Sequence, residues 1–240
     1  MRMRSAQDVQ KHAAARHALR LVRPHMKLGL GTGSTAEYFI AALAHRVRTE
    51  RLPLVCAASS QRSHALGARL GLRFAPLHAL QPLDLVVDGA DELTDPSALI
   101  KGGGGAMLRE RALVRAARAF VVIADASKKV RHLGAFPLPI ELARGAHARL
   151  AAGVRRALRL PPAAERVRRQ RSGALFITDS GHVLYDYALG RIAQPRRLAR
   201  RLEALPGVRA HGLFLDMASA AIIAHADGRI EWLGRRLDGA

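Results

Sequence analysis

The first half of the chain alternates short apolar runs, polar or glycine-rich loops and amphipathic stretches. The first such unit is the apolar run Met26–Leu30, the loop Gly31–Thr35 and the stretch Ala36–Val47, whose apolar residues recur at helical spacing. Short apolar strands that alternate with helices are typical of a parallel, doubly wound sheet, so the pattern predicts an α/β fold. The other apolar runs expected to form strands of this sheet are Pro53–Ala58, Leu83–Val87 and Phe120–Ala124.

A polar loop directly follows each of these apolar runs. The loops are Gly31–Thr35, Ser59–Ser63, Asp88–Glu92 and Asp125–Lys129. The carboxyl ends of parallel strands meet at one edge of a sheet, and ligands of such folds bind in the crevice beyond them. We therefore expect the loops to gather on one rim of the sheet and to form the functional site there.

The pattern changes after Lys129. Phe136-Pro137-Leu138-Pro139 is expected to break regular structure. A later apolar strand, Ala218–Ala224, belongs to the tail of the chain. We predict one domain over residues 1–134 plus 210–240 and a smaller α+β domain over residues 135–209. The elements expected in the smaller domain are a helix over Ala143–Leu158, strands over Ala174–Thr178 and His182–Tyr187, and a helix over Pro195–Leu205.

Composition narrows the class of protein. Hydrophobic residues make up 49% of the 240 positions, enough for a substantial core. No apolar run is long enough to cross a bilayer, and residues 1–21 contain no signal-like apolar stretch. The single cysteine, Cys56, excludes an intrachain disulfide and a multi-cysteine metal site. We expect a cytoplasmic protein without membrane contact.

The formal net charge of +20 raises the question of a nucleic-acid partner. Arginines supply most of this charge, but aromatic residues are only 4% of the chain and no nucleic-acid-binding motif accompanies the arginines. A solvated, arginine-rich surface is the favoured interpretation, and binding to nucleic acid is not expected. A positive field would still speed the capture of an anionic substrate.

The segment Gly29-Leu30-Gly31-Thr32-Gly33-Ser34-Thr35 lies between a predicted strand and a predicted helix. Its glycines let the backbone approach a ligand, and amides at a helix start attract anions, so the segment favours phosphate binding over a plain tight turn. It lacks the Lys-Ser or Lys-Thr of a Walker loop. Ser34 takes the place of the third glycine of a dinucleotide fingerprint, which argues against a dehydrogenase.

The acidic loop Asp88-Gly89-Ala90-Asp91-Glu92 holds three carboxylates at a strand end. Carboxylates this close repel one another, and their pKa values rise if they are desolvated. The loop is therefore suited to proton handling or to metal binding, with a solvated turn as the alternative. A metal site would need histidine or further carboxylates, which the segment lacks.

The segment Lys101-Gly102-Gly103-Gly104-Gly105-Ala106 precedes a predicted helix over Met107–Arg118. A flexible linker is one interpretation, but a linker would not usually lie between a strand-end loop and a helix of one domain. Glu110 falls in the first helical turn. The helix dipole lowers the pKa of such a carboxylate and burial raises it, and the sequence leaves open which effect is larger. Lysine is scarce in this chain, yet Lys101 and Lys128 both stand in strand-end loops, where an ammonium suits a phosphate or an oxyanion.

These segments together resemble the ribose-5-phosphate isomerase family of the A type. The resemblance covers approximately residues 6–228. The motifs that carry it, in order, are Gly31-Thr32-Gly33-Ser34-Thr35, Asp88-Gly89-Ala90-Asp91-Glu92, Lys101-Gly102-Gly103-Gly104, Arg109-Glu110 and Ile123-Ala124-Asp125-Ala126-Ser127-Lys128.

The resemblance implies a Rossmann-like domain with a smaller lid domain, assembled as a homodimer or larger homo-oligomer. It implies a metal-free enzyme without a cofactor, in which Glu110 is the proton acceptor and Lys11 is a further candidate near the phosphate. The catalytic residues expected are Glu110, Asp88, Asp91 and Lys101. The substrate-binding residues expected are Thr32, Gly33, Ser34, Thr35, Asp88, Gly89, Ala90, Asp91, Lys101, Gly102, Gly103, Gly104 and Lys128.

The activity implied is aldose–ketose isomerisation between ribose 5-phosphate and ribulose 5-phosphate through an enediolate, a step of the pentose phosphate pathway. A regulatory domain that senses a sugar phosphate is the alternative, because such a domain would keep the phosphate loop without needing Glu110.

Overall fold

The computed structural model describes residues 5–237, so residues 1–4 and 238–240 of the predicted first domain lie outside the described residues. Its main feature is a six-stranded sheet with the order β13-β12-β6-β3-β1-β2. Every neighbouring pair is parallel except β12 and β13. The predicted parallel α/β fold is confirmed. The strands are β1 Lys27–Leu30, β2 Val55–Ala58, β3 Leu85–Asp88, β6 Phe120–Asp125, β12 Ala220–Ala224 and β13 Ile230–Gly234.

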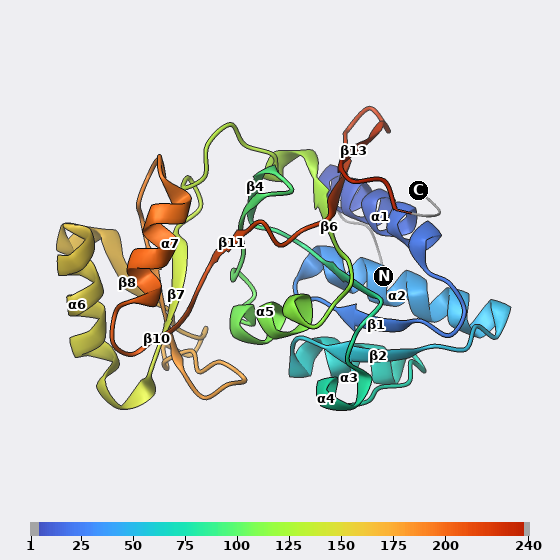
Figure 1. The fold of residues 1–240 in the computed structure, drawn as a ribbon, viewed down its shortest axis with the longest axis horizontal. Helices are drawn as coiled ribbons and strands as arrows, with labels where there is room; N and C mark the ends of the chain where they lie inside the picture. Colours follow the sequence, from blue (N-terminus) through green and yellow to red (C-terminus); the bar gives the residue numbers. More distant parts are fainter. Residues whose placement is uncertain (1–4, 238–240) are drawn as a thin grey trace.

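Helices cover both faces of this sheet because its inner strands are apolar on both sides (Figure 1). Val121 and Ile123 of β6 pack with residues of α1 and α2, whereas Val122 and Ala124 pack with α5, as the alternation of side chains along a strand requires. The helices of this part are α1 Ala6–Ala18, α2 Ser34–Glu50, α3 Gln61–Arg69, the single turn α4 Leu77–Leu80 and α5 Met107–Arg115, with the 3-10 turns η1 Leu19–Leu21 and η2 Ala126–Lys128.

An antiparallel four-stranded sheet with the order β10-β7-β9-β8, called the second sheet below, lies apart from the main sheet and has its own apolar core (Figure 1). A small three-stranded sheet, β11-β5-β4, lies between the two larger sheets, and β11 continues from β10 (Figure 1). The elements of these sheets and their helices are β4 Glu92–Asp95, β5 Ala98–Ile100, β7 Leu138–Leu142, η3 Arg144–Ala146, α6 His147–Leu158, η4 Pro162–Ala164, β8 Glu165–Val167, β9 Val183–Tyr187, α7 Pro195–Glu203, β10 Val208–His211 and β11 Leu213–Leu215.

The second half departs from the expected elements in three places. The proline-rich segment does not break the structure, because Leu138 and Pro139 begin β7, where Pro139 still offers its carbonyl oxygen to Gly212 N–H at 2.8 Å. The strand expected over Ala174–Thr178 forms only isolated bridges, since a tight turn at Gly173, with φ +85°, folds it back on the preceding segment. The helix expected from residue 143 begins at His147, after η3.

The strand order decides where a ligand can bind. Strand β2 lies on one side of β1 and β3 on the other, so the chain reverses direction across the sheet at the carboxyl end of β1. A crevice opens at such a switch point, and the loops after β1 and β3 line it. Among residues 5–237, no helix is both long and apolar enough to span a membrane.

Candidate active site

A cavity of about 130 Å³ lies at this switch point. Loops from β1, β3, β5 and η2 surround it, together with the first turn of α5 and one side of α1. The lining residues are Gln7, Lys11, Thr32, Gly33, Ser34, Thr35, Gly89, Ala90, Asp91, Lys101, Gly102, Gly104, Glu110 and Lys128.

A buried cluster of charged side chains lies at the cavity, and two of its members, Lys101 and Glu110, line the cavity wall. Lys101 Nζ lies 2.8 Å from Asp88 Oδ2 and 3.4 Å from Glu110 Oε2, and it donates to Gly89 O at 2.6 Å. All three side chains are at most 2% exposed. Buried charges persist only when they are paired, so the ammonium and the carboxylates hold each other in place.

Asp88 is fixed by the backbone as well as by Lys101. Its Oδ1 accepts hydrogen bonds from Thr32 N–H at 3.1 Å and from Gly89 N–H at 2.7 Å. A Cβ atom on Gly31 would lie 2.0 Å from Asp88 Cγ, so only glycine fits beside this carboxylate. The close packing explains why a glycine loop and an acidic loop occur together in this sequence.

Burial decides the protonation of Glu110. Desolvation and the nearby Asp88 carboxylate raise the pKa of Glu110 to about 8, against the opposing effect of Lys101. Burial is the largest of these effects, so the pKa of Glu110 lies above its ordinary value. Burial also raises the pKa of Asp88, while the pKa of Lys101 is raised because the Asp88 and Glu110 carboxylates outweigh desolvation.

Asp91 belongs to the same acidic loop but faces the cavity. Its Oδ2 accepts a hydrogen bond from Gly103 N–H at 2.7 Å. Burial raises the pKa of Asp91, and the Gly103 bond and the charges of Lys101 and Lys128 act in the opposite direction. A carboxyl group of this kind can exchange protons with a substrate hydroxyl.

Hydroxyl groups support the loop at the start of α2. Thr32 Oγ1 lies 2.7 Å from Ser59 Oγ, 2.8 Å from Ser60 Oγ and 3.3 Å from Ser63 Oγ, and Ser63 Oγ donates to Gly31 O at 2.7 Å. This cluster joins the loops after β1 and β2 and leaves the first amides of α2 beside the cavity. Amides at a helix start are suited to an anion such as phosphate.

Helix α1 closes one side of the cavity and was not predicted from the sequence. Its Gln7 Nε2 donates to Asp125 Oδ1 at 3.2 Å and to Ser127 Oγ at 3.0 Å, which ties α1 to η2. The signal that could have found this helix is Ser5, whose side chain accepts from Asp8 N–H as an N-cap.

The structure brings nearly all the expected site residues to one cavity. Asp88 and Gly103 do not line it: Asp88 lies behind Lys101, and Gly103 holds Asp91. Lys11 and Lys128 both line the cavity, as do Ser34 and Thr35 at the start of α2. The neighbours of Glu110 bind other partners: Arg109 Nη1 donates to Asp179 Oδ2, and Arg111 donates to the carbonyl groups of Leu213 and His211.

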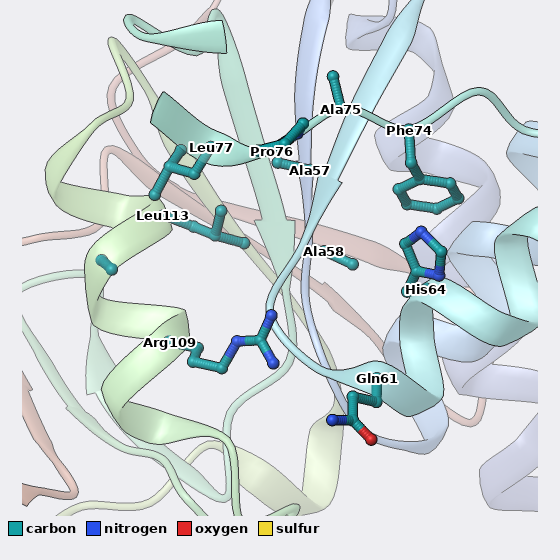
Figure 2. A pocket seen from close by; sticks show the side chains of 11 residues that line it. Ala57, Ala58, Gln61, His64, Phe74, Ala75, Pro76, Leu77, Arg109 and Leu113 are labelled. Carbon is teal, nitrogen blue, oxygen red and sulfur yellow. The ribbon is translucent and has the colours of Figure 1, made fainter. Parts of the chain in front are cut away.

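A second cavity, of about 420 Å³, lies on another side of α5 (Figure 2). Apolar side chains such as Phe74 and Leu113 form much of its wall, and Arg109 points into it. Asp179, in the turn that precedes β9, lies close to this cavity. Its Oδ2 is 3.4 Å from Arg109 Nη1 and accepts a hydrogen bond from Gln61 N–H at 2.7 Å. No carboxylate lines this cavity among the described residues, so the acid–base groups belong to the smaller one.

Within residues 5–237, no cluster of three histidine, cysteine, aspartate or glutamate side chains is arranged to hold a metal ion. An ammonium, that of Lys101, occupies the space between the buried carboxylates.

A doubly wound sheet that holds an acid–base cluster beside an anion-binding helix start is the architecture of an α/β enzyme acting on a small phosphorylated molecule. A family model described as ribose 5-phosphate isomerase A (phosphoriboisomerase A) matches residues 55–228. The chain belongs to this family.

Relatives of known name cover almost the whole chain. It is 48% identical over 226 residues to ribose-5-phosphate isomerase A of Methylorubrum extorquens, covering 93% of this chain and 95% of the relative. It is 45% identical to the protein of the same name from Bartonella quintana, covering 95% and 97%. Among solved structures, ribose 5-phosphate isomerase from Plasmodium falciparum matches with a TM-score of 0.89 at 27% identity, covering 96% of this chain and 100% of that one. A D-ribose-5-phosphate isomerase in complex with phospho-erythronic acid matches with a TM-score of 0.88 at 30% identity, covering 95% and 99%.

Proposed function

We propose that this protein catalyses the reversible isomerisation of ribose 5-phosphate and ribulose 5-phosphate, a step of the pentose phosphate pathway. The observation that carries the proposal is the position of Glu110, which is buried beside Lys101 in a cavity that also holds the anion-binding start of α2. The names and coverage of the relatives support the same activity.

Glu110 acts as the base. Its ionised carboxylate takes the C2 proton of the open-chain aldose, and the C–H electron pair forms the C1=C2 bond of an enediolate with its negative charge on O1. A proton moves from O2 to O1, and Glu110 returns its proton to C1 to give the ketose. The pKa of Glu110, about 8, is close to neutral pH, so the carboxyl group can both accept the proton and return it.

Lys101 and the glycine-loop amides stabilise the charge on the oxygen atoms. An ammonium held by two buried carboxylates is already oriented and does not reorganise during the reaction, which is the condition for effective electrostatic stabilisation. Asp91 transfers the hydroxyl protons during ring opening and between O1 and O2. Asp88 holds Lys101, and its direct contact with the substrate stays a prediction.

In this proposal the phosphate group binds at Thr32, Gly33, Ser34 and Thr35, with Lys128 and Lys11 as its cations, and the support is that all six residues line the cavity. The remaining substrate contacts proposed are Gly89, Ala90, Gly102, Gly103 and Gly104. We further propose that the reaction needs no metal or cofactor, that the enzyme works in the cytoplasm as a homodimer or larger homo-oligomer, and that residues 135–209 act as the lid domain.

Incubation with ribose 5-phosphate in deuterated water tests the reaction. We expect ribulose 5-phosphate that carries solvent deuterium at C1, because the proton held by Glu110 exchanges with water. Ketose formation without any deuterium at C1 would argue for direct hydride transfer instead. Binding of the sugar phosphate without turnover would favour the regulatory alternative, which no observation in the structure favours.

A further inference from the structure

An arginine next to a strand of the second sheet contacts the glycine loop of the active site, Gly102–Gly105. Arg168 Nη1 donates to Gly102 O at 2.7 Å and to Gly103 O at 3.2 Å. Arg168 directly follows β8, and it is far from the loop in sequence. The second sheet therefore contacts the catalytic part of the molecule at the backbone of the loop that follows Lys101.

Arg168 is itself fixed in position. Its Nε donates to Asp186 Oδ2 at 2.9 Å and its Nη2 to Asp186 Oδ1, a two-bond contact that fits the planar guanidinium. Its backbone N–H donates to Leu184 O at 2.8 Å, and its carbonyl accepts from Phe176 N–H at 3.0 Å. The side chain is 15% exposed. A guanidinium anchored at both ends can impose a direction on the carbonyl groups that it contacts.

The carbonyl directions determine where the loop amides point. In a trans peptide the C=O and the following N–H point in opposite directions. Because Gly102 O points to Arg168, the Gly103 N–H points away from it, and this N–H is the donor to Asp91 Oδ2. By the same geometry, the bond of Gly103 O to Arg168 turns the Gly104 N–H away from the second sheet.

Gly104 lines the active-site cavity, and a Cβ atom on it would lie 3.0 Å from Thr32 Cγ2. Among the described residues, none accepts a hydrogen bond from Gly104 N–H. This amide is therefore a free donor beside the cavity.

We propose that Arg168 is a positioning residue, which directs the Gly103 N–H to Asp91 and the Gly104 N–H into the cavity as a donor to the substrate's developing oxyanion. The inference rests on the proposed isomerase function for its catalytic consequence, while its structural part concerns the loop alone.

Loss of Arg168 would lower kcat rather than raise KM. Removal of one well-placed oxyanion donor costs about 100- to 1000-fold in kcat, so a donor that is present but misdirected should cost about 10- to 100-fold. Because the phosphate contacts lie elsewhere, KM for ribose 5-phosphate should stay within about threefold of wild type.

The test compares R168Q with R169Q. Arg169 is the next residue, and its Nη1 donates to Gly173 O at 2.8 Å within its own hairpin, so both variants lose the same charge. R168K keeps the charge without the planar donor set, and D186N removes the anchor, so both should be impaired in kcat. Restoration of full kcat by R168K would overturn the positioning role, because charge alone would then suffice.

A second measurement follows the conformation of the loop and does not depend on enzyme activity. In ¹⁵N-labelled protein, the amide signals of Gly103 and Gly104 should move in R168Q and stay in place in R169Q. Unchanged loop amides, or moved amides with kcat equal to that of R169Q, would overturn the proposal. If R168Q fails to fold, R168K and D186N provide both measurements. If the wild type fails to isomerise ribose 5-phosphate, the proposed function fails, and the amide signals still decide whether Arg168 directs the loop.

Discussion

Replacement of Glu110 by glutamine should inactivate the protein and stabilise it at alkaline pH. The Glu110 carboxyl is 2% exposed and has a pKa of about 8, against an ordinary value of 4.5. Between these values the folded protein holds a proton that the unfolded chain has lost. Folding therefore takes up a proton, and the free energy of unfolding falls as pH rises from about 4.5 to about 8.

The size of this effect follows from the shift in pKa. At about 1.4 kcal/mol per pKa unit, the shift of Glu110 corresponds to a loss on the order of 5 kcal/mol across this range. Asp88 shares the Lys101 ammonium with Glu110, so the two protonations are not independent and part of the effect stays with Asp88. The neutral amide of Glu110→Gln resembles the protonated acid, so this variant should lack the part of the pH-dependent loss that belongs to Glu110.

Urea denaturation of both proteins between pH 5 and pH 9 measures this difference. The two free energies of unfolding should nearly coincide at pH 5, and the variant should be the more stable protein at pH 9. Glu50→Gln, which removes an exposed carboxylate of α2, is the matched control and should follow the wild-type profile. Parallel profiles for wild type and Glu110→Gln would refute the reasoning.

The same variant tests the chemistry. The isomerase rate should fall by about two to four orders of magnitude, because general acid–base catalysis contributes that much. In the wild type, kcat/KM should rise with pH up to about 8 and then level off, since the base must be ionised. Retained turnover in a folded Glu110→Gln protein would reject the assignment of the base.

Three further predictions address the site and its support. Gly31→Ala should destabilise the fold by about 3 kcal/mol, because its Cβ would overlap Asp88. The control Gly153→Ala should stabilise the fold by about 0.5–1 kcal/mol, because Gly153 lies inside α6 with open space around it. Thermal unfolding measures both variants, and equal melting temperatures would contradict the packing argument. Thr32→Val should lower the free energy of unfolding by about 1–3 kcal/mol, because buried Ser59 loses a hydroxyl partner, and it should also weaken substrate binding. Denaturation measures the first effect and KM the second. A wild-type KM in this variant would show that Thr32 does not belong to the phosphate site. Activity should survive dialysis against a strong chelator, and a loss that a divalent metal restores would contradict the metal-free mechanism.

The sequence alone determined four strands of the main sheet, β1, β2, β3 and β6, and the loops that follow them, whereas the places of β12 and β13 in the sheet came from the structure. Apolar runs of strand length followed by polar loops specify local structure, because the spacing of apolar residues reflects which face of an element is buried. The rule that carboxyl ends of parallel strands share an edge then places Gly31–Thr35 and Asp88–Asp91 together. The motifs shared with ribose-5-phosphate isomerase A predicted the family, and the family model and the named relatives confirm it.

Only the tertiary structure decided how the cluster works. Lys101 follows β5, a strand of the separate three-stranded sheet, and it meets Asp88 and Glu110 because β5 pairs with β11, far away in the chain. The pKa of Glu110 depends on how completely these segments exclude water, which no local pattern encodes.

The same limit applies to α1, to β7 with its proline and to Arg168. Each is weakly marked in its own sequence, and each is fixed by partners more than 30 residues away: Gln7 by Asp125, Leu138 by Tyr187, and Arg168 by Gly102. Periodicity identifies an element because it records burial along one segment. Contacts between distant segments depend on the packing of the whole chain, so residues that act through them become visible only in the folded structure.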